Sequence, residues 1–179
     1  MANLLQTARV AAACSFAALA AFAQYAHADE YSDVNRLVQA KQYDEALARA
    51  DKYLAGKPRD PQMRFLKGVI EADSGKRAEA ITTYTQLTQE YPELPEPYNN
   101  LAVLYAQEGE YDKARDALEG AVRANPGYAT AYENLGDVYA KLASQSYAKA
   151  QRIDPANATA PAKLALVRQL LSSTQAAAH

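Results

Sequence analysis

The chain has 179 residues and a formal net charge of −2, and 22% of its side chains are charged. A near-neutral balance without a basic stripe argues against a nucleic-acid-binding protein. One cysteine and two histidines are too few for a disulfide framework or for the usual zinc site.

Residues 1–28 have the pattern of a secretory signal peptide. Arg9 precedes an uncharged run from Val10 to Ala23, and Ala26 and Ala28 form the small-x-small pattern of a cleavage site. As a helix the run would span about 21 Å, which is less than the roughly 30 Å hydrocarbon core of a bilayer. We therefore expect a chain that is cleaved after Ala28, is exported to the bacterial periplasm and has no stable membrane span.

A second interpretation of this region remains open. The segment Ala11-Ala12-Ala13-Cys14 is similar to the lipobox of bacterial lipoproteins and would leave a lipidated Cys14. Only a short apolar stretch precedes this cysteine, however, and the hydrophobic run continues beyond it. The lipid-anchored form is therefore the alternative to the soluble one.

A period of 34 residues runs through the remaining chain. Pro58, Pro92 and Pro126 follow it, which indicates one supersecondary unit copied along the sequence. Small residues repeat with the same period at places where helices should approach closely, since a larger side chain there would cost about 1–3 kcal/mol. These packing positions are Ala46, Ala80 and Ala114, and Gly68, Ala102 and Gly136.

Residues 95–128 show what the unit is. An apolar stripe with helical spacing ends at Gly109, a second helix follows, and Pro126 closes the unit because proline cannot continue a helix. The two helices therefore form a helix–turn–helix hairpin. We expect the tyrosines of this pattern and of its next copy to pack in the core: Tyr98, Tyr105, Tyr132 and Tyr139.

These residues resemble the tetratricopeptide repeat (TPR) family, whose signature appears here as Tyr98, Leu101-Ala102, Tyr105, Ala114, Leu118 and Pro126. The resemblance implies an all-α fold of stacked hairpins in a short right-handed superhelical solenoid. We expect repeats at 29–60, 61–94 and 95–128, a shortened fourth repeat at 129–157, a capping helix at 158–172 and a disordered tail at 173–179. The fourth repeat should form a narrowed hairpin, because Pro155 follows Pro126 by 29 residues instead of 34.

The composition offers little catalytic chemistry. After cleavage at Ala28 no cysteine nucleophile remains, and His179 lies at the end of the predicted tail. We therefore expect no enzyme, no cofactor and no metal site, although an acid-only site stays open.

The resemblance implies that the first helix of each repeat lines a concave groove for a partner. Its early part is aromatic and apolar and its late part acidic, so we expect a protein or peptide partner that is apolar with a basic flank. In the second repeat Arg64 takes the expected aromatic place, and Phe65 could face either the groove or the core. The predicted groove residues are Tyr31, Asn35, Phe65, Val69, Asn99, Asn100, Val103, Glu133, Asn134 and Asp137.

Together these features predict a non-enzymatic TPR adaptor or scaffold of the periplasm, with envelope assembly or quality control as candidate processes. Two alternatives remain. One is a lipid-anchored or membrane-complex-associated assembly factor, and the other is a small-ligand receptor or enzyme that uses the groove.

Overall fold

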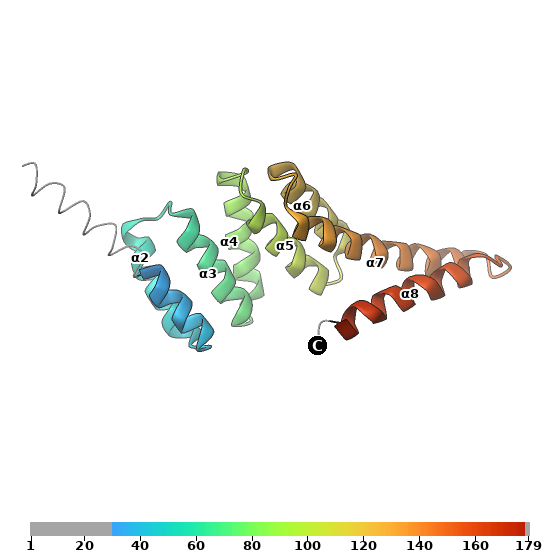
Figure 1. Ribbon diagram of the computed structural model, residues 1–179, viewed down its shortest axis with the longest axis horizontal. Helices are drawn as coiled ribbons and strands as arrows, with labels where there is room; N and C mark the ends of the chain where they lie inside the picture. Colours follow the sequence, from blue (N-terminus) through green and yellow to red (C-terminus); the bar gives the residue numbers. More distant parts are fainter. Residues whose placement is uncertain (1–29, 178–179) are drawn as a thin grey trace, which may run out of the picture. The chain divides into compact units, whose positions relative to one another are not determined.

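The computed structural model describes residues 30–177 (Figure 1). Residues 30–39 are helical, and the helices that follow are α2 (Tyr43–Gly56), α3 (Pro61–Asp73), α4 (Arg77–Glu90), α5 (Pro95–Gln107), α6 (Tyr111–Ala124), α7 (Ala129–Ile153) and α8 (Ala160–Ala177). The described residues contain no strand, so the predicted all-α class is confirmed. The predicted signal peptide, with Ala26 and Ala28, lies outside them.

The chain divides into two compact units, and the boundary follows Ser74. Unit 1 contains helix 30–39, α2 and α3. Its core is formed by residues that face inward from these helices, namely Val34, Leu37, Ala46, Ala50, Met63 and Ile70. Gly68 of α3 is also buried.

Unit 2 contains α4 to α8, and each helix contacts the next one along the chain. Pro95 begins α5, since the first helical position needs no backbone N–H. Gly109 lies between α5 and α6 with a φ of +77°, a conformation that a glycine adopts without a Cβ penalty. The core of the α4–α6 region is formed by Ala80, Tyr84, Leu87, Leu101, Ala102, Leu104, Ala114, Leu118 and Ala121.

The fourth repeat differs from the prediction. Instead of a narrowed hairpin, the structure has one continuous helix of 25 residues, α7. Its first residue corresponds to the start of α5 and its last to the end of α6. Tyr139 corresponds to Tyr105 and Ala143 to Ala114, so the five missing residues lie within 106–113, which contain the turn. Residues 140–146 include neither glycine nor proline, so nothing stops the helix there.

The loss of the turn changes the surroundings of three residues that we expected to be packed. Tyr132 is 50% exposed and Tyr139 is 47% exposed. Gly136 is exposed as well, and a Cβ placed on it would meet nothing within 4 Å. The prediction that these residues pack inside a fourth hairpin is wrong, because the second helix of that hairpin does not fold back onto them.

The C-terminal helix is longer than predicted. Asn157 accepts hydrogen bonds from the backbone N–H groups of Thr159 and Ala160, and α8 then continues to Ala177. Residues 173–177, which we expected to be disordered, are therefore helical; this segment is rich in alanine and contains no helix-breaking residue. Among the described residues, no helix has the length and apolar character needed to cross a bilayer.

Candidate functional site

Unit 2 contains a pocket of about 300 Å³ formed by three consecutive helices. Its lining residues come from α5 (Ala102, Val103, Ala106 and Gln107), α6 (Tyr111 and Leu118) and α7 (Asn134, Asp137, Val138 and Lys141). Ala102 and Ala106 are small and leave room between the helices. The packing that brings α5, α6 and α7 together therefore also creates the cavity.

The pocket has an apolar floor and a polar edge. Leu118 and Val138 are buried, whereas Val103 is 39% exposed and available for contact. Asp137 and Lys141 lie one helical turn apart on α7, so they place opposite charges at the same edge. This arrangement suits an apolar side chain whose neighbouring groups are polar.

The predicted asparagines form a hydrogen-bonded chain beside this pocket. Asn99 is 6% exposed, and its Oδ1 accepts a hydrogen bond of 2.8 Å from Asn134 Nδ2. Asn100 Nδ2 donates to the Tyr84 hydroxyl at 3.1 Å. Asn99 and Asn100 therefore join α5 to its neighbours, and Asn134 is held in position at the edge of the pocket.

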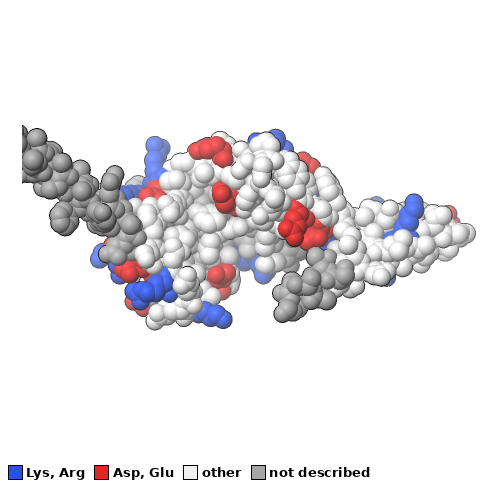
Figure 2. Space-filling view, in the orientation of Figure 1, with Lys and Arg blue, Asp and Glu red and all other residues white. Residues whose placement is uncertain are grey.

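The remaining predicted residue of unit 2, Glu133, is exposed and does not belong to the pocket lining given above. Figure 2 shows acidic groups gathered on the visible face of unit 2 next to the start of α7. The pocket itself carries Lys141 as well as Asp137, so its edge is less acidic than the sequence predicted. Sequence reasoning missed Lys141, although it lies one turn after Asp137 on the same side of the helix.

In unit 1, the side chain of Tyr31 is half-buried and contacts Tyr53 and Asp60. Its hydroxyl donates to Asp60 Oδ2 at 2.6 Å, and its ring lies 5.6 Å from the ring of Tyr53. Burial and the hydrogen bond to Asp60 raise the pKa of the Tyr31 hydroxyl far above its usual value. Asn35 is exposed, while Phe65 and Val69 are half-buried.

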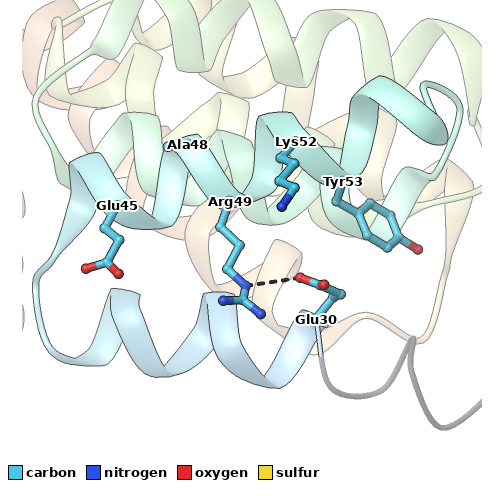
Figure 3. Close-up of a pocket in the computed structure, with 6 residues that line it drawn as sticks. All are labelled: Glu30, Glu45, Ala48, Arg49, Lys52 and Tyr53. Carbon is cyan, nitrogen blue, oxygen red and sulfur yellow. Dashed lines mark hydrogen bonds and ion pairs between the residues drawn. The ribbon is translucent and has the colours of Figure 1, made fainter.

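A second hollow of about 440 Å³ lies on unit 1, between α2 and the start of helix 30–39. Figure 3 shows Arg49 pointing from α2 toward Glu30, and its Nε donates to Glu30 Oε2 at 3.0 Å. Arg49 also pairs with Asp33. Both carboxylates compensate the charge of Arg49 in surface ion pairs. We therefore assign no ligand to this hollow.

The described residues contain no cluster of histidine, cysteine, aspartate or glutamate that could hold a metal ion. The fold and the pocket define a helical-repeat protein with a pocket between three consecutive helices. Models of the tetratricopeptide repeat family match residues 31–95 and 71–142, which together take in more than half of the chain. The chain belongs to the tetratricopeptide repeat family.

Known proteins of this family resemble parts of the chain. The chloroplastic tetratricopeptide repeat domain-containing protein PYG7 of Arabidopsis thaliana is 40% identical over 73 residues, which are 38% of this chain. The chain thus spans about a quarter, 24%, of that relative's length.

Solved structures show the same fold. The crystal structure of MamA is 24% identical, has a TM-score of 0.57, and the match covers 76% of this chain and 82% of MamA. YrrB, described as a TPR protein with an unusual peptide-binding site, is 25% identical with a TM-score of 0.54, covering 58% of this chain and 54% of YrrB. SycD of Yersinia enterocolitica, solved with a peptide of the translocator YopD, is 18% identical and has a TM-score of 0.58. The match covers 63% of this chain and 92% of SycD.

Proposed function

We propose that this protein is a non-enzymatic adaptor that holds an apolar segment of a protein partner in the pocket formed by α5, α6 and α7. The observation that carries the proposal is the pocket itself: an apolar floor of Leu118 and Val138, an exposed Val103, and polar groups only at the edge. Such a site can bury one or two apolar side chains of a peptide or helix and hydrogen-bond its flanks.

Two similar structures support a peptide as the occupant. YrrB is described with a peptide-binding site, and SycD was solved with a bound peptide. The Asp137 carboxylate would favour a basic residue next to the apolar segment. Lys141, one helical turn further along α7, would favour an acidic residue. The partner therefore carries charges of both signs around its apolar segment. The sequence alone predicted only a basic flank.

The proposal is tested by photo-crosslinking from Val103 in the cells that produce the protein. The matched control places the same photoreactive residue at Asp116, which is exposed on α6. We expect a discrete crosslinked protein from position 103 and not from position 116, and its loss when Val138→Glu introduces a charge into the pocket floor. Equal crosslinking from both positions would contradict binding in this pocket.

We also propose that the chain acts in the periplasm after removal of residues 1–28. The support is the sequence pattern of residues 1–28, with small residues at Ala26 and Ala28. The mass of the protein isolated from its own cells tests this. A chain that starts at Asp29 supports a soluble exported protein, a chain that starts at a lipidated Cys14 favours the membrane-anchored alternative, and an uncut chain contradicts export.

A further inference from the structure

One side of α7 carries two sets of residues that belong to different helices in a regular repeat. Its first half presents Tyr132, Gly136 and Tyr139, which correspond to Tyr98, Ala102 and Tyr105 of α5. Its second half presents Ala143, Tyr147 and Ala150, which correspond to Ala114, Leu118 and Ala121 of α6. Since these positions are three or four residues apart, both sets lie on the same side of one helix.

In the third repeat the two sets pack against each other. Gly120 of α6 lies so close to the Tyr98 ring that an added Cβ would come within 2.5 Å of it. Ala102 is 1% exposed. Ala114, Leu118 and Ala121 are each at most 1% exposed. The two sets are therefore complementary surfaces that become buried when a hairpin closes.

In α7 the first set is exposed and the second set is only partly covered. Tyr132, Gly136 and Tyr139 are exposed, and Ala143, Tyr147 and Ala150 are only half-buried. The ammonium of Lys163 in α8 lies 5.7 Å from the centre of the Tyr147 ring, so α8 covers part of the second set. A continuous helix cannot fold its second half onto its first, so one chain alone cannot close this contact.

We propose that two copies of this chain pair through α7 in antiparallel orientation, so that each copy supplies the second helix of the other copy's fourth repeat. This is an exchange of identical elements, which arises when a hinge is too short to allow closure within one chain. The partner surface is present in the sequence itself, so no other protein has to be invoked.

The register of this pairing follows from the third repeat. Because Tyr98 faces Gly120 there, Tyr132 faces Lys149 of the second copy. The centre of the pairing then falls between Ala140 and Lys141, which is the middle of the segment that carries the two sets. The first set of each copy therefore contacts the second set of the other copy, and the two contacts are related by a single two-fold axis, as an isologous interface requires.

Lys149 is one place where the pairing must differ from the third repeat. It takes the position of Gly120, so the Tyr132 ring cannot keep the orientation of Tyr98. The corresponding residues in the first two repeats are Lys52 and Gln86, so this position already accepts long side chains. The aliphatic part of Lys149 can lie along the ring, with its ammonium over the aromatic face.

The charges of the two sets of residues are compatible with such pairing. All six residues of the two sets are uncharged, and Lys149 lies beside them. The two sets themselves therefore bring no like charges together when two copies pair.

The first test compares two substitutions at Gly136. In a single chain there is open space around this residue, so both Gly136→Ala and Gly136→Arg should fold. In the paired form alanine fits, as Ala102 does, whereas arginine prevents close contact. By size-exclusion chromatography with light scattering, we expect twice the chain mass for the unchanged protein and for Gly136→Ala, and a single chain mass for Gly136→Arg.

A second variant restores the missing turn and does not depend on a disruptive side chain. Inserting Ala-Gln-Glu-Gly-Glu, the sequence of residues 106–110, after Tyr139 should let the fourth hairpin close within one chain. We expect a single chain mass with unchanged helical circular dichroism. A single mass for the unchanged protein, or a double mass for Gly136→Arg or for the insertion variant, would overturn the proposal.

Discussion

At the scale of single residues, Asp60 connects all three helices of unit 1. Its Oδ1 accepts the backbone N–H of Met63 at 3.0 Å and so caps α3. Its Oδ2 accepts the hydroxyls of Tyr31 at 2.6 Å and Tyr53 at 3.0 Å, from helix 30–39 and from α2. Burial disfavours the charged carboxylate, but the hydrogen bonds from Tyr31, Met63 and Tyr53 outweigh burial and lower the pKa of Asp60.

We expect Asp60→Asn to lower the free energy of unfolding by about 1–2 kcal/mol at pH 7, because hydrogen bonds to a charged acceptor become neutral ones. Folding lowers the pKa of Asp60. The contribution of this carboxylate to the free energy of unfolding is therefore complete above the pKa of about 4 in the unfolded chain, and it is lost as the pH falls through the pKa in the folded protein. Urea unfolding at pH 7 and pH 3 should therefore show a smaller pH effect in Asp60→Asn. The exposed Asp73→Asn is the control, and an equal effect in both variants would contradict this role.

The candidate site shows what the sequence could and could not predict at this scale. Val103 and Asp137 were predicted from the unburied stripe of their helices and Asn134 from the resemblance to the family, and all three line the pocket. The burial of Asn99 depends on the rotation of α5 against its neighbours, which the repeat pattern does not specify. The participation of Tyr111 depends on how α6 lies across α5, a tertiary relation without a local sequence signal.

At the scale of elements, the turn within each repeat decides whether two helices form a hairpin. Gly75 and Gly109 have positive φ values of 81° and 77°. Lys41, which stands one repeat earlier, has a φ of 57° and is a non-glycine residue in the same conformation. The turn at Lys41 therefore has the same left-handed backbone conformation as the turns at Gly75 and Gly109, but with a residue whose Cβ disfavours it.

We expect Lys41→Gly to stabilise the protein by about 0.5–1 kcal/mol, since the left-handed conformation costs an ordinary residue roughly 1–2 kcal/mol and the greater freedom of glycine in the unfolded chain offsets part of this. Thermal unfolding followed by circular dichroism measures the gain. Lys41→Ala removes the same charge but keeps the Cβ and should give no such gain. A similar increase in both variants would show that charge, and not backbone conformation, is responsible.

The fourth repeat shows where the sequence pattern was insufficient. The spacing of Pro126 and Pro155 showed that five residues are missing, but it did not show which part of the repeat had lost them. We expected a shorter hairpin, whereas the structure has no turn at all. The reason lies in helix propagation, which continues at little cost through residues 140–146 when no glycine or proline interrupts it.

At the scale of the whole molecule, burial is uneven along the chain. In α5 and α6 many side chains are buried, including Leu101, Leu104 and Leu118. In the described side chains of α8, Ala160 and Leu164 are buried, while Leu166 and Leu170 are 67% and 56% exposed. The α7–α8 region therefore has less apolar packing to resist opening.

We expect backbone amides of residues 142–172 to exchange with deuterium faster than those of α5 and α6, by roughly a factor of ten or more, because regions with few buried apolar contacts open at lower free energy. Hydrogen exchange followed by mass spectrometry of peptides measures this on the intact, dilute protein. The matched comparison uses α6, which is helical and of similar length to the second half of α7. Equal protection in both regions would contradict the prediction.

The absent turn in α7 also has a consequence for regulation. A hairpin that closes within one chain forms equally well at every concentration, whereas a contact completed by a second chain follows mass action. The exposed side of α7 would then be free when the protein is scarce and covered when it is abundant. The amount of protein in the cell, instead of a ligand or a modification, would decide which surface it offers to other molecules.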